Sequence, residues 1–160
     1  MFIKILNEIN FIRLMIKNDI NANTVEGVED TYIISINYPY GDKTGYFKKD
    51  YNNVLRLFFD DVDYDEEIYD EEINQVRELI AFRPSDAKKV LTFLEKIKKN
   101  LNDNTKLIIH CKAGISRSGA VGIYANDFFR LKYDDFMKEN PMVRPNSCVL
   151  RTLNRLTYYE

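Results

Sequence analysis

Hydrophobic residues gather in short runs along the chain, and the runs alternate with longer stretches in which apolar positions are three or four residues apart. The short runs predict four buried strands, at residues 2–6, 31–37, 53–59 and 106–111. The last run, KLIIHC, is apolar until it ends in a histidine, a cysteine and a glycine-containing loop, as a central parallel strand does at its carboxyl end.

The longer stretches predict helices that each bury one face. Isoleucines at positions 5, 9, 12, 16 and 20 predict a helix after the first strand, with these side chains toward the core. Ser85 is the predicted N-cap of a helix that reaches about Leu101 and buries Val90, Leu91, Leu94, Ile97 and Leu101. Further helices are predicted at 74–82, 118–131, 134–139 and 147–157. This order of strands and helices favours an α/β fold, a three-layer α/β/α sandwich.

The segment 60–72 interrupts this pattern with nine acidic residues in thirteen positions. Its apolar content is too low for burial, and we expect a solvated loop there.

Composition and charge limit the classes of function. A chain of 160 residues, 45% of them hydrophobic, predicts a single domain over residues 1–160. A net charge of −2 argues against a general nucleic-acid binder, and charges within the apolar N-terminal stretch argue against membrane insertion. Two cysteines are too few for a disulfide scaffold, so we expect a cytoplasmic protein, with a monomer as the default.

The chemistry concentrates in residues 110–118, HCKAGISRS, between a predicted strand and a predicted helix. Backbone N–H groups of a loop in this position can surround phosphate oxygens, and the helix N-terminus adds a positive dipole. The expected phosphate-binding residues are Lys112, Ala113, Gly114, Ile115, Ser116 and Arg117. Gly114 permits a tight loop, and the Arg117 guanidinium can bind two oxygens at once.

Cys111 is the expected nucleophile. The loop dipoles and Arg117 favour its thiolate, which would attack a phosphate bound above it and form a phosphocysteine. Ser118 is expected to donate to the sulfur when it leaves again. His110, the single histidine, is expected to order the loop rather than transfer protons.

The segment HCKAGISRS resembles the signature of the cysteine-dependent protein tyrosine and dual-specificity phosphatases, His-Cys-x5-Arg-Ser. The resemblance covers residues 54–156 and implies the sandwich of these phosphatases, with no metal or cofactor. It also implies a general acid on an upstream loop, for which Asp61 is our choice because NVLRLFFDD is similar to the strand and acid turn of the family. Asp60 and Asp63 stay open as alternatives.

Two residues of the C-terminal part complete the candidate site. Asn146 resembles the residue that helps to place the hydrolytic water in relatives, although a helix cap explains it equally well. Cys148 is either a core residue or a redox partner of Cys111.

The resemblance implies a protein phosphatase acting on phosphotyrosine, with phosphoserine and phosphothreonine as further candidates. Two alternatives use the same loop. The first is an enzyme with another substrate, either an RNA 5′-triphosphatase or a phosphoinositide phosphatase. The second is a phosphate-binding module without turnover. The acidic segment 60–72 disfavours a long polyanionic substrate such as nucleic acid, because its field would repel one.

Overall fold

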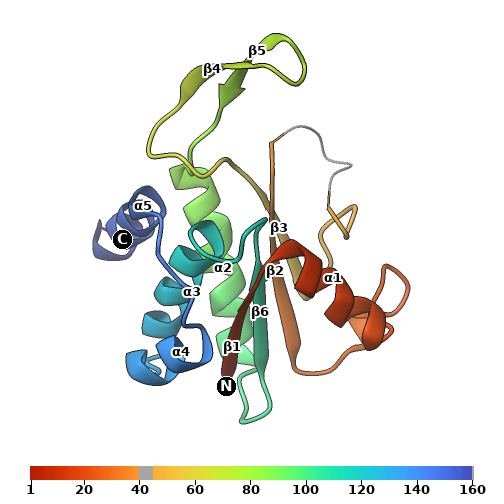
Figure 1. Cartoon of the computed structure of the whole chain (residues 1–160). Coiled ribbons are helices and arrows are strands. Elements are labelled where there is room, and N and C mark those ends of the chain that lie inside the picture. Colours follow the sequence, from red (N-terminus) through yellow and green to blue (C-terminus); the bar gives the residue numbers. More distant parts are fainter. Residues whose placement is uncertain (40–44, 160) are drawn as a thin grey trace.

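A parallel four-stranded sheet forms the centre of the molecule. The computed structural model describes residues 1–39 and 45–159. The strand order is β1-β6-β2-β3, with all three pairings parallel (Figure 1). The strands are β1 (Phe2–Leu6), β6 (Lys106–His110), β2 (Thr31–Asn37) and β3 (Val54–Phe58). The four predicted strands are therefore confirmed.

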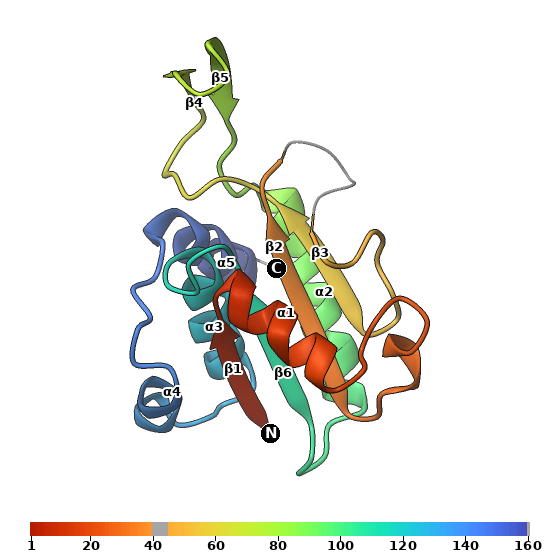
Figure 2. The same cartoon turned by 45° about the vertical axis from the view of Figure 1, so that its right-hand side comes forward.

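Helices cover both faces of the sheet, which confirms the predicted α/β/α sandwich. Figure 2 shows α1 on one face and α2, α3 and α5 on the other. The elements are α1 (Glu8–Lys17), the 3-10 helix η1 (Val25–Gly27), α2 (Pro84–Lys99), α3 (Arg117–Phe128), α4 (Tyr133–Glu139) and α5 (Ser147–Tyr159). Within the described part of the chain, no helix has the length and apolar character needed to cross a membrane.

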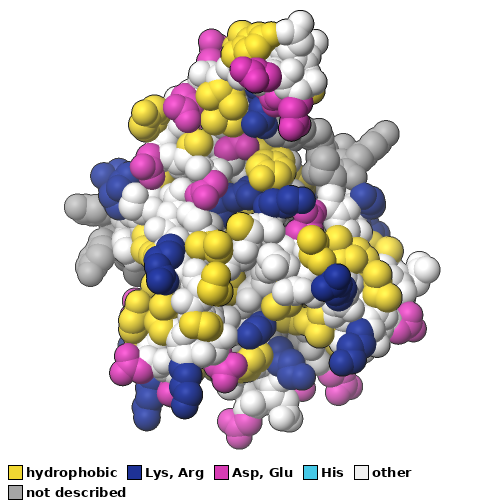
Figure 3. Space-filling view, in the orientation of Figure 1, with side chains coloured by type: hydrophobic (Ala, Val, Ile, Leu, Met, Phe, Trp, Pro, Cys, Tyr) yellow, Lys and Arg dark blue, Asp and Glu magenta, His cyan; other side chains and the backbone are white. Residues whose placement is uncertain are grey.

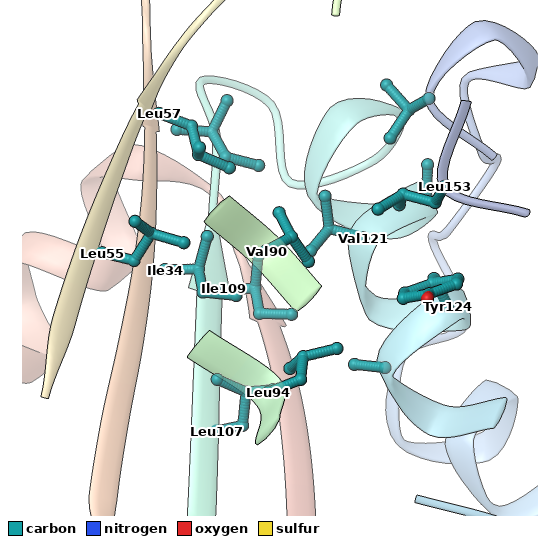
Figure 4. Close-up of a cluster of buried hydrophobic side chains, with 14 of the residues drawn as sticks. Ile34, Leu55, Leu57, Val90, Leu94, Leu107, Ile109, Val121, Tyr124 and Leu153 are labelled. Carbon is teal, nitrogen blue, oxygen red and sulfur yellow. The ribbon is translucent and has the colours of Figure 1, made fainter. Parts of the chain in front are cut away.

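Alternate residues of each strand supply two separate hydrophobic clusters, as expected for a sheet covered on both faces. Ile34 and Ile109 face the larger cluster, where they meet Val90 and Leu94 of α2 (Figure 4). The smaller cluster lies under α1 and joins five buried side chains from the helix and the sheet: Phe11, Met15, Ile33, Val54 and Ile108.

The isoleucine stripe predicted for the first helix is wrong at Ile5, Ile9 and Ile16, while Ile12 and Ile20 do pack in the cluster under the helix. Ile9 and Ile16 are 60% and 67% exposed, whereas Phe11 and Met15 are fully buried. Ile5 belongs to β1 and faces the larger cluster on the other side of the sheet. A stripe that starts at Ile5 therefore does not follow the face of α1 that packs on the sheet.

The helix α2 begins and ends differently from the prediction. Arg83, not Ser85, is its N-cap, because Pro84 takes the first helical position and the Asp86 carboxylate accepts a hydrogen bond from the Arg83 N–H at 3.0 Å. The helix ends at Lys99, and Leu101 beyond it is 43% exposed.

The predicted helix 74–82 is wrong, and the predicted loop 60–72 is wrong for residues 66–70. Residues 66–79 form an antiparallel hairpin of β4 (Glu66–Asp70) and β5 (Gln75–Leu79), which projects from the body (Figure 1). Asn74 closes the turn with a φ of 53°, in the left-handed region that asparagine tolerates. An ion pair of 3.2 Å joins Arg77 to Asp70 across the strands. The turn at Asn74 and the pairing between the two strands thus account for a hairpin where a helix was predicted.

Candidate active site

The candidate nucleophile lies where β6 ends, at the carboxyl edge of the parallel sheet. Cys111 follows His110 directly and is 2% exposed. Its Sγ accepts a hydrogen bond of 3.3 Å from the Gly114 N–H and lies 3.0 Å from the Ser118 hydroxyl oxygen. Two groups able to donate to sulfur thus contact the thiol, an arrangement that suits a thiolate.

Gly114 fixes the path of the loop between β6 and α3. Its φ is 69°, and a Cβ at this position would lie 2.5 Å from the backbone nitrogen of Asn7. The loop is therefore packed tightly on the junction of β1 and α1, where only glycine fits. A backbone hydrogen bond from the Glu8 N–H to the Lys112 carbonyl oxygen, 3.2 Å long, holds the same contact.

The other side of the loop is held by the chain that leads into α5. The backbone N–H groups of Arg144 and Asn146 donate to the carbonyl oxygens of Ile115 and Ser116, each at 3.0 Å. The predicted phosphate-binding residues Lys112–Arg117 therefore form one loop, fixed at both flanks.

The side chain of Lys112 is engaged outside this loop. Its ammonium donates to the Glu8 carboxylate at 3.0 Å, and this hydrogen bond raises the pKa of Lys112.

Arg117 begins α3 and is 4% exposed. Its Nη1 donates to the carbonyl oxygen of Phe59 at 3.0 Å, and its guanidinium carbon lies 4.8 Å from the centre of the Tyr38 ring. Hydrogen bonding and a cation–π contact thus restrict the guanidinium plane. Sequence reasoning did not assign Tyr38, although its place just after β2, at the same sheet edge, was a usable signal.

The candidate acid is attached to the cysteine loop. The Asp61 carboxylate accepts hydrogen bonds of 2.8 Å from the Ser116 hydroxyl and from Asn146 Nδ2. Asp60 is buried, and its carboxylate accepts from the Ile80 N–H at 2.8 Å, a structural contact. Asp63 accepts from the Ser147 hydroxyl at 3.2 Å. Asp61 is thus hydrogen-bonded to a residue of the cysteine loop, whereas the contacts named for Asp60 and Asp63 are to Ile80 and Ser147.

His110 is buried beneath the loop. Its Nε2 lies 2.6 Å from the Ser35 hydroxyl oxygen, and its ring stacks on Phe11 with 3.9 Å between ring centres. Burial lowers the pKa of His110 to about 4, with a smaller contribution in the same direction from Arg117, while the Glu8 carboxylate opposes the shift. The ring is therefore neutral near pH 7, which suits a positioning role. Sequence reasoning did not identify Ser35.

Asn146 has a second contact besides Asp61. Its Oδ1 accepts from the Val149 N–H at 3.0 Å, so it caps α5 while its amide group holds the acid. Cys148 is a buried free thiol in the first turn of α5, and its Sγ lies 3.9 Å from the carbonyl oxygen of Phe82.

A cavity of about 150 Å³ lies beside the loop. Its lining includes Arg117, Lys112, Glu8, Asn37 and Tyr38. Among residues 1–39 and 45–159, no three His, Cys, Asp or Glu side chains are placed to hold a metal ion. The arrangement offers a thiol, anion-binding backbone and a nearby carboxylate, which together suit phosphoryl transfer.

A match to a known protein family agrees with this chemistry. Residues 81–139, from just before α2 to the end of α4, match the family described as protein-tyrosine phosphatase. This stretch contains Cys111 and Arg117, and it confirms the resemblance that the sequence predicts. Comparison with curated protein sequences gives no significant match.

A solved structure shows the same fold class at low sequence identity. PTP-2 phosphatase of Cydia pomonella has a TM-score of 0.50 and 14% identity, and the alignment covers 95% of this chain and 81% of that one. The human tyrosine phosphatase-like serine/threonine/tyrosine-interacting protein has a TM-score of 0.48 and 20% identity, with 86% and 85% covered. Tk-PTP in the active form has a TM-score of 0.43 and 19% identity, with 84% of each chain covered.

Proposed function

We propose that this protein is a cysteine-dependent phosphatase that hydrolyses phosphotyrosine in proteins without a metal ion. The observation that carries the proposal is the arrangement around Cys111. Its Sγ contacts the Gly114 N–H and Ser118, and Asp61 is hydrogen-bonded to Ser116 of the same loop. A nucleophile, an anion-binding loop and an acid are thereby within one small region.

In the first step the Cys111 thiolate attacks phosphorus in line with the leaving oxygen. The S–P bond forms, the bond from phosphorus to the tyrosyl oxygen breaks, and Asp61 gives its proton to that oxygen. The Arg117 guanidinium stabilises the charge that spreads over the phosphoryl oxygens, because its planar fork can donate to two of them.

In the second step water attacks the phosphocysteine. Asp61, now ionised, takes a proton from the water, the new O–P bond forms, and the S–P bond breaks. The departing thiolate accepts hydrogen bonds from Ser118 and the Gly114 N–H. Asn146 contributes by holding the Asp61 carboxylate, and it is also the candidate for placing the water.

Charge favours a protein substrate over a long polyanion. Asp61 lies within the segment 60–72, nine of whose thirteen residues are acidic. Over the roughly 10 Å screening distance at 0.1 M salt, these carboxylates repel RNA or a phosphoinositide surface. RNA 5′-triphosphatase activity, phosphoinositide hydrolysis and binding without turnover are therefore outcomes of the test rather than part of the proposal.

The test measures phosphate release in excess EDTA from a phosphotyrosine peptide, a phosphothreonine peptide, a phosphoinositide and a 5′-triphosphate RNA. Cys111→Ser is the matched control, since it removes the thiol and leaves the loop. We expect turnover of the phosphotyrosine peptide and its loss in Cys111→Ser, which should still bind sulfate or vanadate.

Three results would overturn the proposal. Turnover retained by Cys111→Ser would exclude a thiolate mechanism. Release from RNA or phosphoinositide alone would move the protein to another substrate class, and binding of phosphopeptide without any release would make it a binding module.

A further inference from the structure

The β4–β5 hairpin has one face that is displayed to solvent. Strand pairing places Tyr69 opposite Val76 and Glu67 opposite Glu78, and all four side chains are exposed. Tyr69 is 58% exposed and Val76 is 64% exposed. An apolar pair thus lies next to a pair of carboxylates on the same face.

The opposite face contains an ion pair of the hairpin. Ile68, Asp70 and Arg77 are half-buried there, and Arg77 and Asp70 form the 3.2 Å ion pair. On the displayed face, the Tyr69 hydroxyl donates to the side-chain oxygen of Asn74 in the turn.

The displayed face combines apolar and acidic side chains. Exposed Tyr69 and Val76 leave apolar area in water. A partner with apolar side chains would cover this area, and its cationic side chains would complement the carboxylates beside it. Figure 3 shows hydrophobic and acidic side chains intermixed over the projecting part of the molecule.

Acidic residues are concentrated in the hairpin and its base. Residues 60–79 contain ten acidic residues and one arginine, whereas the rest of the chain has 15 acidic and 22 basic residues. The hairpin and its base are therefore complementary to a basic segment.

The base of the hairpin is fastened beside the candidate acid. The Ile80 N–H donates to Asp60 and the Ala81 N–H donates to Asp65, each at 2.8 Å. Arg83 forms an ion pair of 3.0 Å with Asp65. Asp61 lies in the short connection between these two anchors, so the hairpin extends directly from the acid-bearing segment.

We propose that the face formed by Glu67, Tyr69, Val76 and Glu78 is a docking surface for a basic, partly apolar segment of the phosphoprotein substrate. The inference rests on the proposed function, because it takes a phosphoprotein as the substrate. It adds that the selected phosphoproteins carry a basic, partly apolar segment. A segment held on this face would be tethered close to Asp61, which raises the effective concentration of its phosphorylated residue at the loop.

A binding measurement tests the surface without requiring turnover. The probe is a labelled, unphosphorylated peptide of alternating lysine and leucine or valine, with a glutamate-for-lysine peptide as its control. We expect the Cys111→Ser chain to bind the basic peptide and not the acidic one. The double variant Glu67→Gln/Glu78→Gln should weaken binding roughly tenfold at low salt.

The matched control is Glu29→Gln/Glu95→Gln, which removes two exposed carboxylates outside the hairpin. It should change binding less than twofold. Circular dichroism checks that Glu67→Gln/Glu78→Gln leaves the hairpin folded. Tyr69→Thr/Val76→Thr tests the apolar part with β-favouring residues and should also weaken binding.

A kinetic measurement separates docking from catalysis. The Glu67→Gln/Glu78→Gln variant should lose roughly tenfold in kcat/KM for a phosphotyrosine peptide that carries the basic segment. Its turnover of p-nitrophenyl phosphate, which is too small to reach the hairpin, should be unchanged.

Each alternative result has a distinct meaning. Equal binding of the two peptides, or equal loss in the Glu29→Gln/Glu95→Gln control, would overturn the docking surface while leaving any p-nitrophenyl phosphate turnover intact. Binding without any turnover would support the surface and contradict the proposed function. Conversion of a dimer to a monomer by the hairpin variants in sedimentation would overturn the inference in favour of a second copy of this chain.

Discussion

The Asp61 carboxylate accepts a hydrogen bond of 2.8 Å from the Ser116 hydroxyl, so the candidate acid is attached to the loop that would hold the phosphate. Ser116 is the N-cap residue of α3, but its side chain makes no capping hydrogen bond. Its hydroxyl contacts the acid-bearing segment instead. This contact makes the position of the acid depend on the loop, and it can be tested by substitution.

Asp61→Ala should lower the rate strongly for a poor leaving group and weakly for a good one. General acid catalysis contributes roughly 10²–10⁴-fold, and only a basic leaving oxygen needs the proton. The measurement compares kcat for a phosphotyrosine peptide and p-nitrophenyl phosphate. Asp63→Ala is the control, because Asp63 bonds Ser147 instead of the loop. The same selective loss in Asp63→Ala would identify a different acid.

Asn146 joins two roles that a pair of substitutions can separate. Asn146→Asp keeps an oxygen that can accept from the Val149 N–H but replaces the amide that donates to Asp61. We expect the cap to be kept and the rate with the phosphotyrosine peptide to fall, because the new carboxylate repels Asp61 instead of donating to it. Asn146→Ala should lower the rate as well, and the lost cap should cost about 1 kcal/mol of the free energy of unfolding. Full activity in Asn146→Asp would show that Asp61 does not need this support.

Gly114→Ala should destabilise the protein and impair the loop. The new Cβ would lie 2.5 Å from the backbone nitrogen of Asn7 at a φ of 69°, so the loop or the β1–α1 junction must move. We expect a loss of roughly 1–3 kcal/mol in the free energy of unfolding by denaturant titration, with loss of sulfate binding. Gly27→Ala is the control, because nothing lies within 4 Å of the position that its new methyl group would take. Equal effects at both glycines would contradict the packing argument.

The parts of the site that are contiguous in sequence were predictable, and those built from distant contacts were not. The cysteine, glycine and arginine of residues 110–118 lie in one loop because a strand and a helix fix its ends. Ser35 lies in β2 and Tyr38 directly follows this strand. No local pattern specifies that β2 lies beside β6. The choice among Asp60, Asp61 and Asp63 likewise depended on hydrogen bonds to residues about 20 to 85 positions away.

In the fold, too, some elements were predictable from the local sequence and others were not. Strands β2 and β6 were clear because both of their faces are buried and the sequence is a continuous apolar run. The hairpin was missed because Gln75–Leu79 contains three polar residues and packs mainly on its partner strand, so neither helical nor buried-strand periodicity applies. The first helix was predicted in the right place with the wrong face, since its stripe was started from a strand residue.

His110 should make stability depend on pH in the acidic range. Burial lowers its folded-state pKa to about 4, against about 6.5 for an exposed histidine, so the unfolded chain binds the proton more readily. The stabilisation is fully present above about pH 6.5 and is lost as the pH falls toward 4, where the loss amounts to about 3 kcal/mol. Urea titrations between pH 7 and pH 4 measure this loss.

His110→Gln isolates the contribution of this one ring. Its amide can still contact the Ser35 hydroxyl but does not titrate, while acidic groups such as Asp65 titrate equally in both proteins. The unchanged chain should therefore lose about 3 kcal/mol more than His110→Gln between pH 7 and pH 4. Parallel stability curves for the two proteins would mean that folding does not lower the pKa of His110, and would contradict the effect of its burial.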